Sequence, residues 1–312
     1  MILKNLSMNN NSKIKKYVFL GDTDSINIEI IIKSHQKLKE KLQYVVIGNI
    51  LELKKYITKL KSNIKLNEIL DPLDFREYNK HHINIFNIEN RYKEKYKNLI
   101  NQIIISNELS YKTKYDLVTM PINKYIFKEK IKFIGMTEYL GKLNKSETIM
   151  LMFGEKFSVI PLTTHINLKD IHKYLNEIAI KKKLNTLMGL LKSKKNSLNF
   201  KTIKFLCYNP HCSENSTIGN EDKIVRKIIK KFKKISGPYP ADSAFKDYKK
   251  DTLFVSTYHD QVLTPYKIIN KRGFNYTLGL SYRRLSPSHG TARDIKFKNK
   301  SDNTSYLACM LS

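Results

Sequence analysis

The sequence predicts an α/β protein of two lobes, and three observations support this fold class. The chain has 312 residues, enough for one large or two ordinary domains with a sizeable core. Short apolar runs of strand length alternate with longer stretches of helical periodicity along most of the chain. No run of eighteen apolar residues occurs, so no segment is expected to span a membrane.

The individual elements are predicted from the spacing of apolar residues. Strand-like runs occupy the segments 16–20, 44–47, 83–86, 115–118, 131–134, 157–162, 201–206, 253–255 and 262–263. Helical periodicity covers the segments 28–42, 51–60, 92–106, 168–192 and 222–232. Asn167 is a suitable N-cap for the helix that begins at residue 168. Strand, turn and helix therefore follow one another repeatedly, as in α/β folds.

The chain is strongly basic, with 57 Lys and Arg against 28 Asp and Glu and a net charge of +29. Such a charge makes binding to nucleic acid physically plausible. The lysines are spread along the whole chain together with abundant Ile and Asn, which favours a compositional bias and a solvated, charged surface. We expect at most non-specific binding to nucleic acid, and a dedicated nucleic-acid face stays open as the alternative.

The cysteines and the first residues indicate the compartment. Cys207, Cys212 and Cys309 are scattered and lack CxxC spacing, so neither a disulfide framework nor a cysteine zinc site is indicated. The first residues also lack the apolar stretch and the cleavage site of a signal peptide. We therefore expect a soluble protein of the reducing cytoplasm.

Polar residues with useful chemistry are concentrated in the stretch 258–294. His259 and Asp260 lie side by side near apolar runs that resemble buried strands, which would place the imidazole at a strand end. Lys267 and Arg284 supply positive charge for an anionic substrate. On spacing alone, a pair of this kind is more often a hydrogen-bonded structural pair than a site.

The same stretch carries a series of ordered motifs. They read YHDQ at 258–261, NYTLGL at 275–280, RLS at 284–286 and HGTA at 289–292. Earlier in the chain, NPHCSE at 209–214, GPYPADSAF at 237–245 and TMPINK at 119–124 belong to the same series. Together they resemble the signature of the 4-hydroxythreonine-4-phosphate dehydrogenase family, over nearly the whole chain from residue 17.

The resemblance implies the architecture and the partners. It implies two α/β/α lobes similar to the isocitrate and isopropylmalate dehydrogenases, with the active-site cleft between the lobes. We expect one lobe to comprise residues 1–134 and 265–312, and the other to comprise residues 135–264. It also implies a homodimer that shares its active site across the interface, and NAD or NADP as cofactor. No GxGxxG fingerprint occurs, and no cofactor-binding residue is assigned.

The resemblance also implies a divalent metal ion held by His165, His211 and His259. Each of these histidines follows a predicted strand. Neutral imidazoles with one open coordination position suit zinc, cobalt or nickel, and magnesium is a further candidate. Considered one at a time and without the resemblance, each histidine is interpreted by default as a hydrogen-bonded core residue.

The resemblance assigns catalysis to His259, Asp260 and Lys267, with Asp260 either orienting His259 or transferring a proton. It assigns the phosphorylated substrate to Lys267 and to Thr137, Asn275, Arg284 and Met136. The implied reaction is the oxidation of 4-phosphohydroxy-L-threonine to 2-amino-3-oxo-4-phosphooxybutanoate. This product would lose carbon dioxide to give 3-amino-2-oxopropyl phosphate, in vitamin B6 biosynthesis.

The chain departs from the family pattern at two places. Met136 stands where the family has a histidine, and Thr23, Ser25, Asn27 and Ile28 replace glycines and prolines of a loop. Lost glycines raise the cost of any positive φ by about 1 kcal/mol each. Two alternatives therefore stay open, a related dehydrogenase for another phosphorylated hydroxy acid and a repurposed basic homologue that binds nucleic acid.

Overall fold

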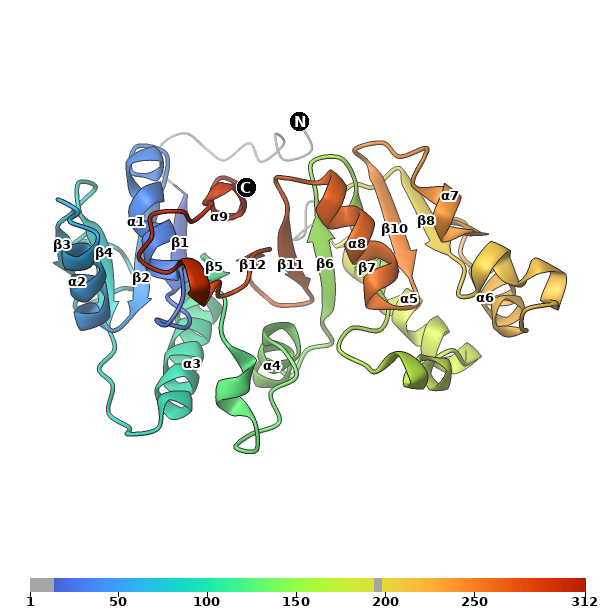
Figure 1. Ribbon diagram of the computed structural model, residues 1–312, viewed down its shortest axis with the longest axis horizontal. Helices are drawn as coiled ribbons and strands as arrows, with labels where there is room; N and C mark the ends of the chain where they lie inside the picture. Colours follow the sequence, from blue (N-terminus) through green and yellow to red (C-terminus); the bar gives the residue numbers. More distant parts are fainter. Residues whose placement is uncertain (1–13, 194–197) are drawn as a thin grey trace. The chain divides into compact units, whose positions relative to one another are not determined.

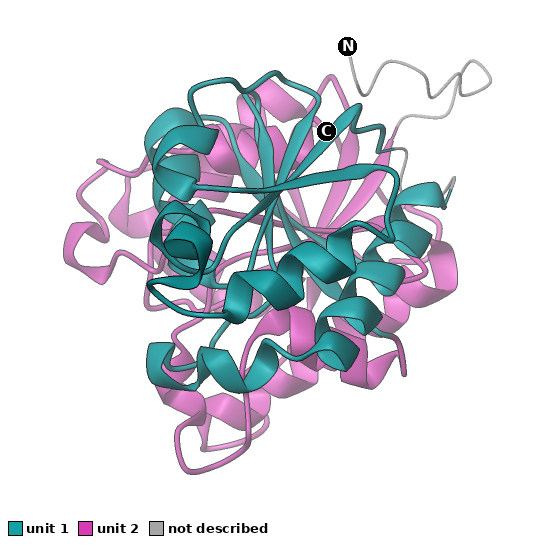
Figure 2. Cartoon of the chain, turned by 90° about the vertical axis from the view of Figure 1, so that its right-hand side faces the viewer, with its two compact units in different colours: residues 1–5, 147–279 teal, residues 6–146, 280–312 magenta. Residues whose placement is uncertain are grey.

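The computed structural model describes residues 14–193 and 198–312 (Figure 1). Within these residues the chain divides into two compact units, which Figure 2 shows in different colours. Unit 1 comprises residues 147–279, and unit 2 comprises residues 14–146 together with 280–312. Both units combine a sheet with helices, which confirms the α/β fold class.

The units divide after residues 146 and 279, whereas the sequence led us to expect boundaries after 134 and 264. Helix α4 (Met136–Leu143) lies in unit 2 because its Leu140 is fully buried in the hydrophobic core of that unit. Helix α8 (His259–Ile269) lies in unit 1 because Val262, Leu263 and Tyr266 are buried in the core there.

Unit 2 is built on parallel strands in the order β3-β4-β2-β1-β5-β12. Its strands are β1 (Lys15–Phe19), β2 (Gln43–Gly48), β3 (Leu66–Glu68), β4 (Ile83–Asn87), β5 (Asp116–Thr119) and β12 (Arg284–Pro287). Its helices include α1 (Asn27–Leu38), α2 (Ile50–Lys59), α3 (Lys95–Thr113), α4 and α9 (Thr304–Met310), with short 3₁₀ helices η1 (Lys124–Phe127) and η5 (Arg293–Ile295). The chain leaves β1 toward β2 and returns to β5 on the other side of β1, so the strand order reverses there. Ligands of open α/β sheets bind at such a reversal.

Unit 1 has the strand order β11-β6-β7-β10-β8-β9, in which β11, β6 and β7 are antiparallel neighbours and the rest pair in parallel. Its strands are β6 (Ile149–Phe153), β7 (Ser158–Pro161), β8 (Thr202–Leu206), β9 (Ile235–Tyr239), β10 (Thr252–Ser256) and β11 (Phe274–Leu278). Its helices include α5 (Glu177–Lys192), α6 (Glu221–Ile229), α7 (Ala241–Ala244), α8, η2 (Leu168–Tyr174) and η4 (Pro210–Ser216). Helix α8 packs on β7 and β10 (Figure 1).

Three predicted elements are wrong. Residues 131–134 form no strand, because Phe133 stacks on Phe127 with 4.4 Å between ring centroids and the segment leads as a loop into α4. The apolar pair 262–263 lies inside α8 and not in a strand. The long helix expected over 168–192 is interrupted, because the Asn176 side chain accepts a hydrogen bond from the Ala179 amide and starts α5 anew.

Among the described residues, no helix is both long and apolar enough to cross a membrane.

Candidate active site

The three histidines assigned to a metal follow three neighbouring parallel strands of unit 1. His165 follows β7, His211 follows β8 and His259 follows β10, each three to five residues after the strand ends. Strand β10 lies between β7 and β8 in the sheet. The carboxyl ends of parallel neighbours meet at one edge, where α/β proteins commonly bind their ligands.

Two of these histidines lie close together. The ring centroids of His165 and His259 are 6.1 Å apart, with an angle of 36° between the ring planes. Nδ1 of His259 lies 2.6 Å from Oδ1 of Asp260, which is 75% exposed. A proton on Nδ1 donated to this carboxylate leaves the lone pair on Nε2, which is the nitrogen that a metal ion would then use.

His211 is placed differently. It is an exposed residue of η4, and the segment 211–216 has positive φ throughout. Within residues 14–193 and 198–312, no group of three His, Cys, Asp or Glu side chains is arranged to hold a metal ion. A single chain thus pairs His165 with His259 but does not complete a three-ligand site.

Unit 2 carries a buried cation at the end of β5. Arg284 is 3% exposed and donates hydrogen bonds from Nε and Nη2 to Oγ1 of Thr119. Its Nη1 lies 3.5 Å from Oγ1 of Thr137, the second residue of α4. Burial lowers the pKa of Arg284 to about 10, so the guanidinium keeps its charge at neutral pH. A fixed, protonated guanidinium beside two hydroxyls is suited to binding an anion.

The remaining predicted substrate residues are divided between the units. Met136 begins α4 beside Thr137 and packs against the hydrophobic core of unit 2. Lys267 is exposed in the last turn of α8, eight residues or about 12 Å along the helix from His259. Asn275 is half-buried on β11, and its Oδ1 is buried without a hydrogen-bond partner within the described residues.

In the loop after β1, other residues stand where the family pattern has glycines. Hydrogen bonds from a side chain hold this loop in place. Gly21 keeps a positive φ of 74°, and a Cβ there would lie 2.6 Å from the Pro121 carbonyl oxygen. Nδ2 of Asn27 donates to the carbonyl oxygens of Leu20, Asp22 and Pro121 at 3.1, 3.2 and 2.8 Å. The Asn27 side chain therefore joins the loops that follow β1 and β5.

Sequence reasoning missed several residues that hold the site. Thr119 is the last residue of β5 and the first of the TMPINK motif. Its place in that motif could have indicated that it contacts Arg284. Asp222 is the first residue of the predicted helix 222–232 and binds the loop that carries His211, a contact that no spacing in the sequence indicated. Asn27 stood out only as a departure from the family pattern.

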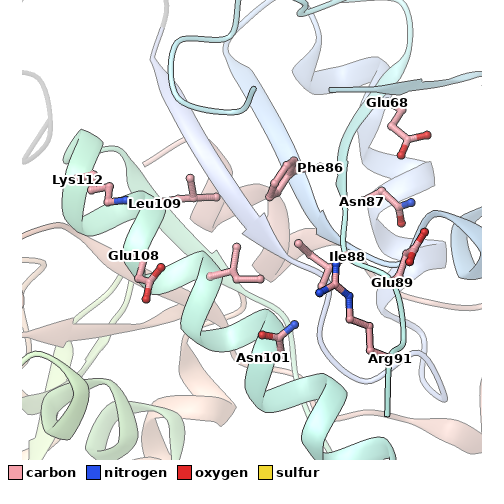
Figure 3. Close-up of a pocket in the computed structure, with 11 residues that line it drawn as sticks. Glu68, Phe86, Asn87, Ile88, Glu89, Arg91, Asn101, Glu108, Leu109 and Lys112 are labelled. Carbon is pink, nitrogen blue, oxygen red and sulfur yellow. The ribbon is translucent and has the colours of Figure 1, made fainter. Parts of the chain in front are cut away.

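A pocket of about 620 Å³ lies in unit 2 (Figure 3). It opens between α3 and the carboxyl ends of β3 and β4. Apolar Phe86, Ile88 and Leu109 lie beside charged Glu108 and Lys112 (Figure 3). None of the predicted site residues is among the described residues that line it.

Comparison with known proteins decides the family. The sequence model of the family described as pyridoxal phosphate biosynthetic protein PdxA matches residues 40–311. A 4-hydroxythreonine-4-phosphate dehydrogenase of Hydrogenobaculum sp. is 35% identical over 293 residues, covering 90% of this chain and 92% of the relative. The chain belongs to the 4-hydroxythreonine-4-phosphate dehydrogenase family. It is accordingly an oxidoreductase of a family described for pyridoxal phosphate biosynthesis.

Further members support this family membership. The 4-hydroxythreonine-4-phosphate dehydrogenase of Aquifex aeolicus is 33% identical, covering 93% of this chain and 94% of its own. The crystal structure of the Klebsiella pneumoniae member has a TM-score of 0.77 and 26% identity, covering 96% of this chain and 98% of its own. The family resemblance seen in the sequence motifs is thus confirmed.

Proposed function

We propose that the protein catalyses the NAD- or NADP-linked oxidation of 4-phosphohydroxy-L-threonine in vitamin B6 biosynthesis. The secondary alcohol loses a hydride to the nicotinamide ring and a proton to solvent or a protein base, which gives 2-amino-3-oxo-4-phosphooxybutanoate and reduced cofactor. This β-keto acid then loses carbon dioxide and yields 3-amino-2-oxopropyl phosphate. The observation that carries the proposal is the placement of three histidines after adjacent parallel strands, in a chain of this family.

A divalent zinc, cobalt or magnesium ion would be held by His165, His211 and His259. The donor set fits such an ion, because His165 and His259 lie close together and Asp260 fixes Nδ1 of His259. When bound, the ion would supply Lewis-acid chemistry that favours the alkoxide and polarises the product ketone. Asp260 keeps His259 in one tautomer and is a candidate to pass on the alcohol proton.

The anionic groups of the substrate would be bound by Arg284, Thr137, Lys267 and Asn275. Arg284 offers a buried charge that is already oriented by Thr119, so little side-chain entropy is lost on binding. Thr137 lies in the first turn of α4, where the positive end of the helix dipole also favours an anion. Lys267 would act as a mobile point charge from its exposed place on α8.

A homodimer with the active site at its interface is part of this proposal. Unit 1 exposes the apolar side chains of Leu168, Tyr174 and Ile178 on η2 and α5, at 63, 44 and 82%. These side chains follow His165 closely along the chain. A second copy that covers them would remove apolar surface from water and would bring a third imidazole to the pair of His165 and His259.

A different phosphorylated hydroxy acid is the second candidate substrate. Met136 supports it, because a thioether packed on the core offers no strong hydrogen bond where the family pattern has histidine. Such a substrate would keep the phosphate and the hydroxyl and differ at the group that the histidine contacts.

Measurement of reduced cofactor decides between these functions. We expect NADH or NADPH to form from 4-phosphohydroxy-L-threonine, to stop after dialysis against a chelator, and to return with zinc, cobalt or magnesium. A phosphorylated hydroxy acid without the amino group is the matched comparison. Turnover of the comparison substrate alone would favour the second candidate, and turnover of neither with any metal or cofactor would contradict both.

A further inference from the structure

We infer that Asp222 is the positioning residue that holds the loop of His211 in place for metal binding. The inference rests on the proposed function, in which His211 is a metal ligand. It concerns a buried carboxylate at the start of α6, which follows β8 and η4 along the chain (Figure 1). Asp222 does not touch a metal site itself and acts through the backbone of the loop.

The carboxylate of Asp222 binds both ends of the segment 208–213. Oδ1 accepts a hydrogen bond from the Tyr208 amide at 2.6 Å, and Oδ2 accepts one from the Asn209 amide at 3.0 Å. Oδ2 also accepts a hydrogen bond from Oγ of Ser213 at 2.7 Å. Asp222 is 1% exposed, so water cannot replace these contacts. His211 therefore lies between residues that are all hydrogen-bonded to the Asp222 carboxylate.

The backbone of this loop needs such support. Residues from His211 to Ser216 all have φ between 41° and 81°, a region that non-glycine residues rarely adopt. The turn therefore persists only because its surroundings hold it. Glu221 contributes, because its Oε2 accepts a hydrogen bond from Nδ2 of Asn209 at 2.8 Å.

An amide cannot replace this carboxylate. Both oxygens of Asp222 accept from backbone N–H groups, and in Asp222→Asn one of them becomes an NH₂ that faces an N–H donor. The variant keeps the size of the side chain but leaves a buried donor without an acceptor. The loop should then open, and His211 should lose its fixed position.

Two measurements on the full-length protein test the inference. Amide hydrogen exchange of residues 208–213 reports whether Asp222 holds the loop. Titration with Co²⁺, followed by its visible absorption, reports metal affinity and ligand geometry. For Asp222→Asn we expect faster exchange in this segment and a Kd for Co²⁺ about 10- to 100-fold higher.

Two further variants provide the controls. Ser213→Ala removes only one donor to Asp222 and should show the same changes to a smaller degree, which keeps the test usable if Asp222→Asn does not fold. Asp116→Asn in unit 2 removes another buried carboxylate, which accepts two hydrogen bonds from Arg283 at 2.8 and 2.6 Å. This variant should lower stability while the Kd for Co²⁺ stays within about twofold of the wild type.

Unchanged exchange of residues 208–213 in Asp222→Asn would overturn the inference. Faster exchange with an unchanged Kd for Co²⁺ would also overturn it, since the loop would then not position a ligand. If the wild-type protein takes up no Co²⁺, the metal in the proposed function fails, while the exchange measurement still decides whether Asp222 holds the loop.

Discussion

At the scale of single residues, the candidate site depends on pairs in which one side chain fixes another. Asp260 fixes Nδ1 of His259, and Thr119 fixes the guanidinium of Arg284. Such pairs set a tautomer or an orientation before any ligand arrives, which reduces the free energy that binding must supply. The roles of these residues can be tested by removing the supporting partner and keeping the functional one.

Asp260→Asn should weaken metal binding by about tenfold, because the amide no longer draws the proton onto Nδ1 of His259. The thermal midpoint should hardly change, since Asp260 is 75% exposed. Equilibrium dialysis with Zn²⁺ measures the effect. Asp74→Asn, which removes the partner of exposed Arg76 in unit 2, is the matched control and should bind as the wild type does. Equal affinity in the two variants would exclude a supporting role for Asp260.

Met136→His should lower the KM for 4-phosphohydroxy-L-threonine by up to about tenfold and leave the metal content unchanged. A restored imidazole adds about 0.5 to 1.5 kcal/mol of hydrogen bonding to the substrate. Steady-state kinetics at saturating cofactor measure this. A KM that stays equal or rises would mean that the start of α4 is built for another substrate, and the second candidate function would gain.

At the scale of elements, side-chain hydrogen bonds and ion pairs join loops and helices to one another. The loop after β1 is held by the side chain of Asn27, and α5 is joined to α6 by Glu177. Both connections use polar side chains to restrict the backbone of the segments that they join. Loss of the first should lower the free energy of unfolding, and the second should make stability depend on pH.

Asn27→Ala should lower the free energy of unfolding by about 2 kcal/mol. The substitution removes three hydrogen bonds and leaves the buried carbonyl oxygens of Leu20 and Asp22 with fewer donors. Urea unfolding with an unchanged m-value would measure the loss. Half-buried Asn303→Ala, which gives up a single hydrogen bond to Oγ of Ser34, is the comparison and should cost less. A loss no larger than that of the comparison would mean that Asn27 does not hold the loop.

The connection between α5 and α6 should make stability depend on pH. Hydrogen bonds from Lys231 and Lys227 lower the pKa of Glu177 from 4.5 to about 2. A lowered folded-state pKa contributes stability that is complete above pH 4.5 and is lost as the pH falls toward 2. Thermal scans should therefore show a smaller decrease over this range for Glu177→Gln than for the wild type, and salt should reduce the difference. Parallel pH profiles at low salt would contradict this assignment.

At the scale of the whole molecule, one chain does not complete the metal site that its family membership leads us to propose. The apolar surface of η2 and α5 and the separated position of His211 both support a second copy. Activity would then depend on association, and protein concentration would become a variable of the assay.

Ile178→Asp should produce a folded monomer with much weaker metal binding. The side chain is 82% exposed, so the charge costs little in the isolated chain but is unfavourable in a covered apolar interface. Sedimentation velocity measures the mass, and far-ultraviolet circular dichroism checks the fold. Exposed Ile268→Asp on α8, at 74%, is the matched control. A dimer with full metal content in the Ile178 variant would place the interface elsewhere.

The sequence by itself determined those strands that consist of one short run of apolar residues. Strands β1, β2, β5 and β10 were predicted within one or two residues, because each is a short run of buried residues that a turn closes. Family motifs also located the three histidines after their strands. These features are decided by neighbours along the chain, so the sequence by itself contains them.

Tertiary structure alone decided the rest. Residues 262–263 have the same apolar character in a strand or a helix, and only packing of α8 on β7 and β10 placed them in a helix. Tertiary structure also decided which residues far apart in sequence become partners, such as Arg284 with Thr119 or Asn27 with Pro121. A hydrogen bond depends on distances of a few tenths of an ångström between side chains, and such distances exist only once strands from distant parts of the chain have paired.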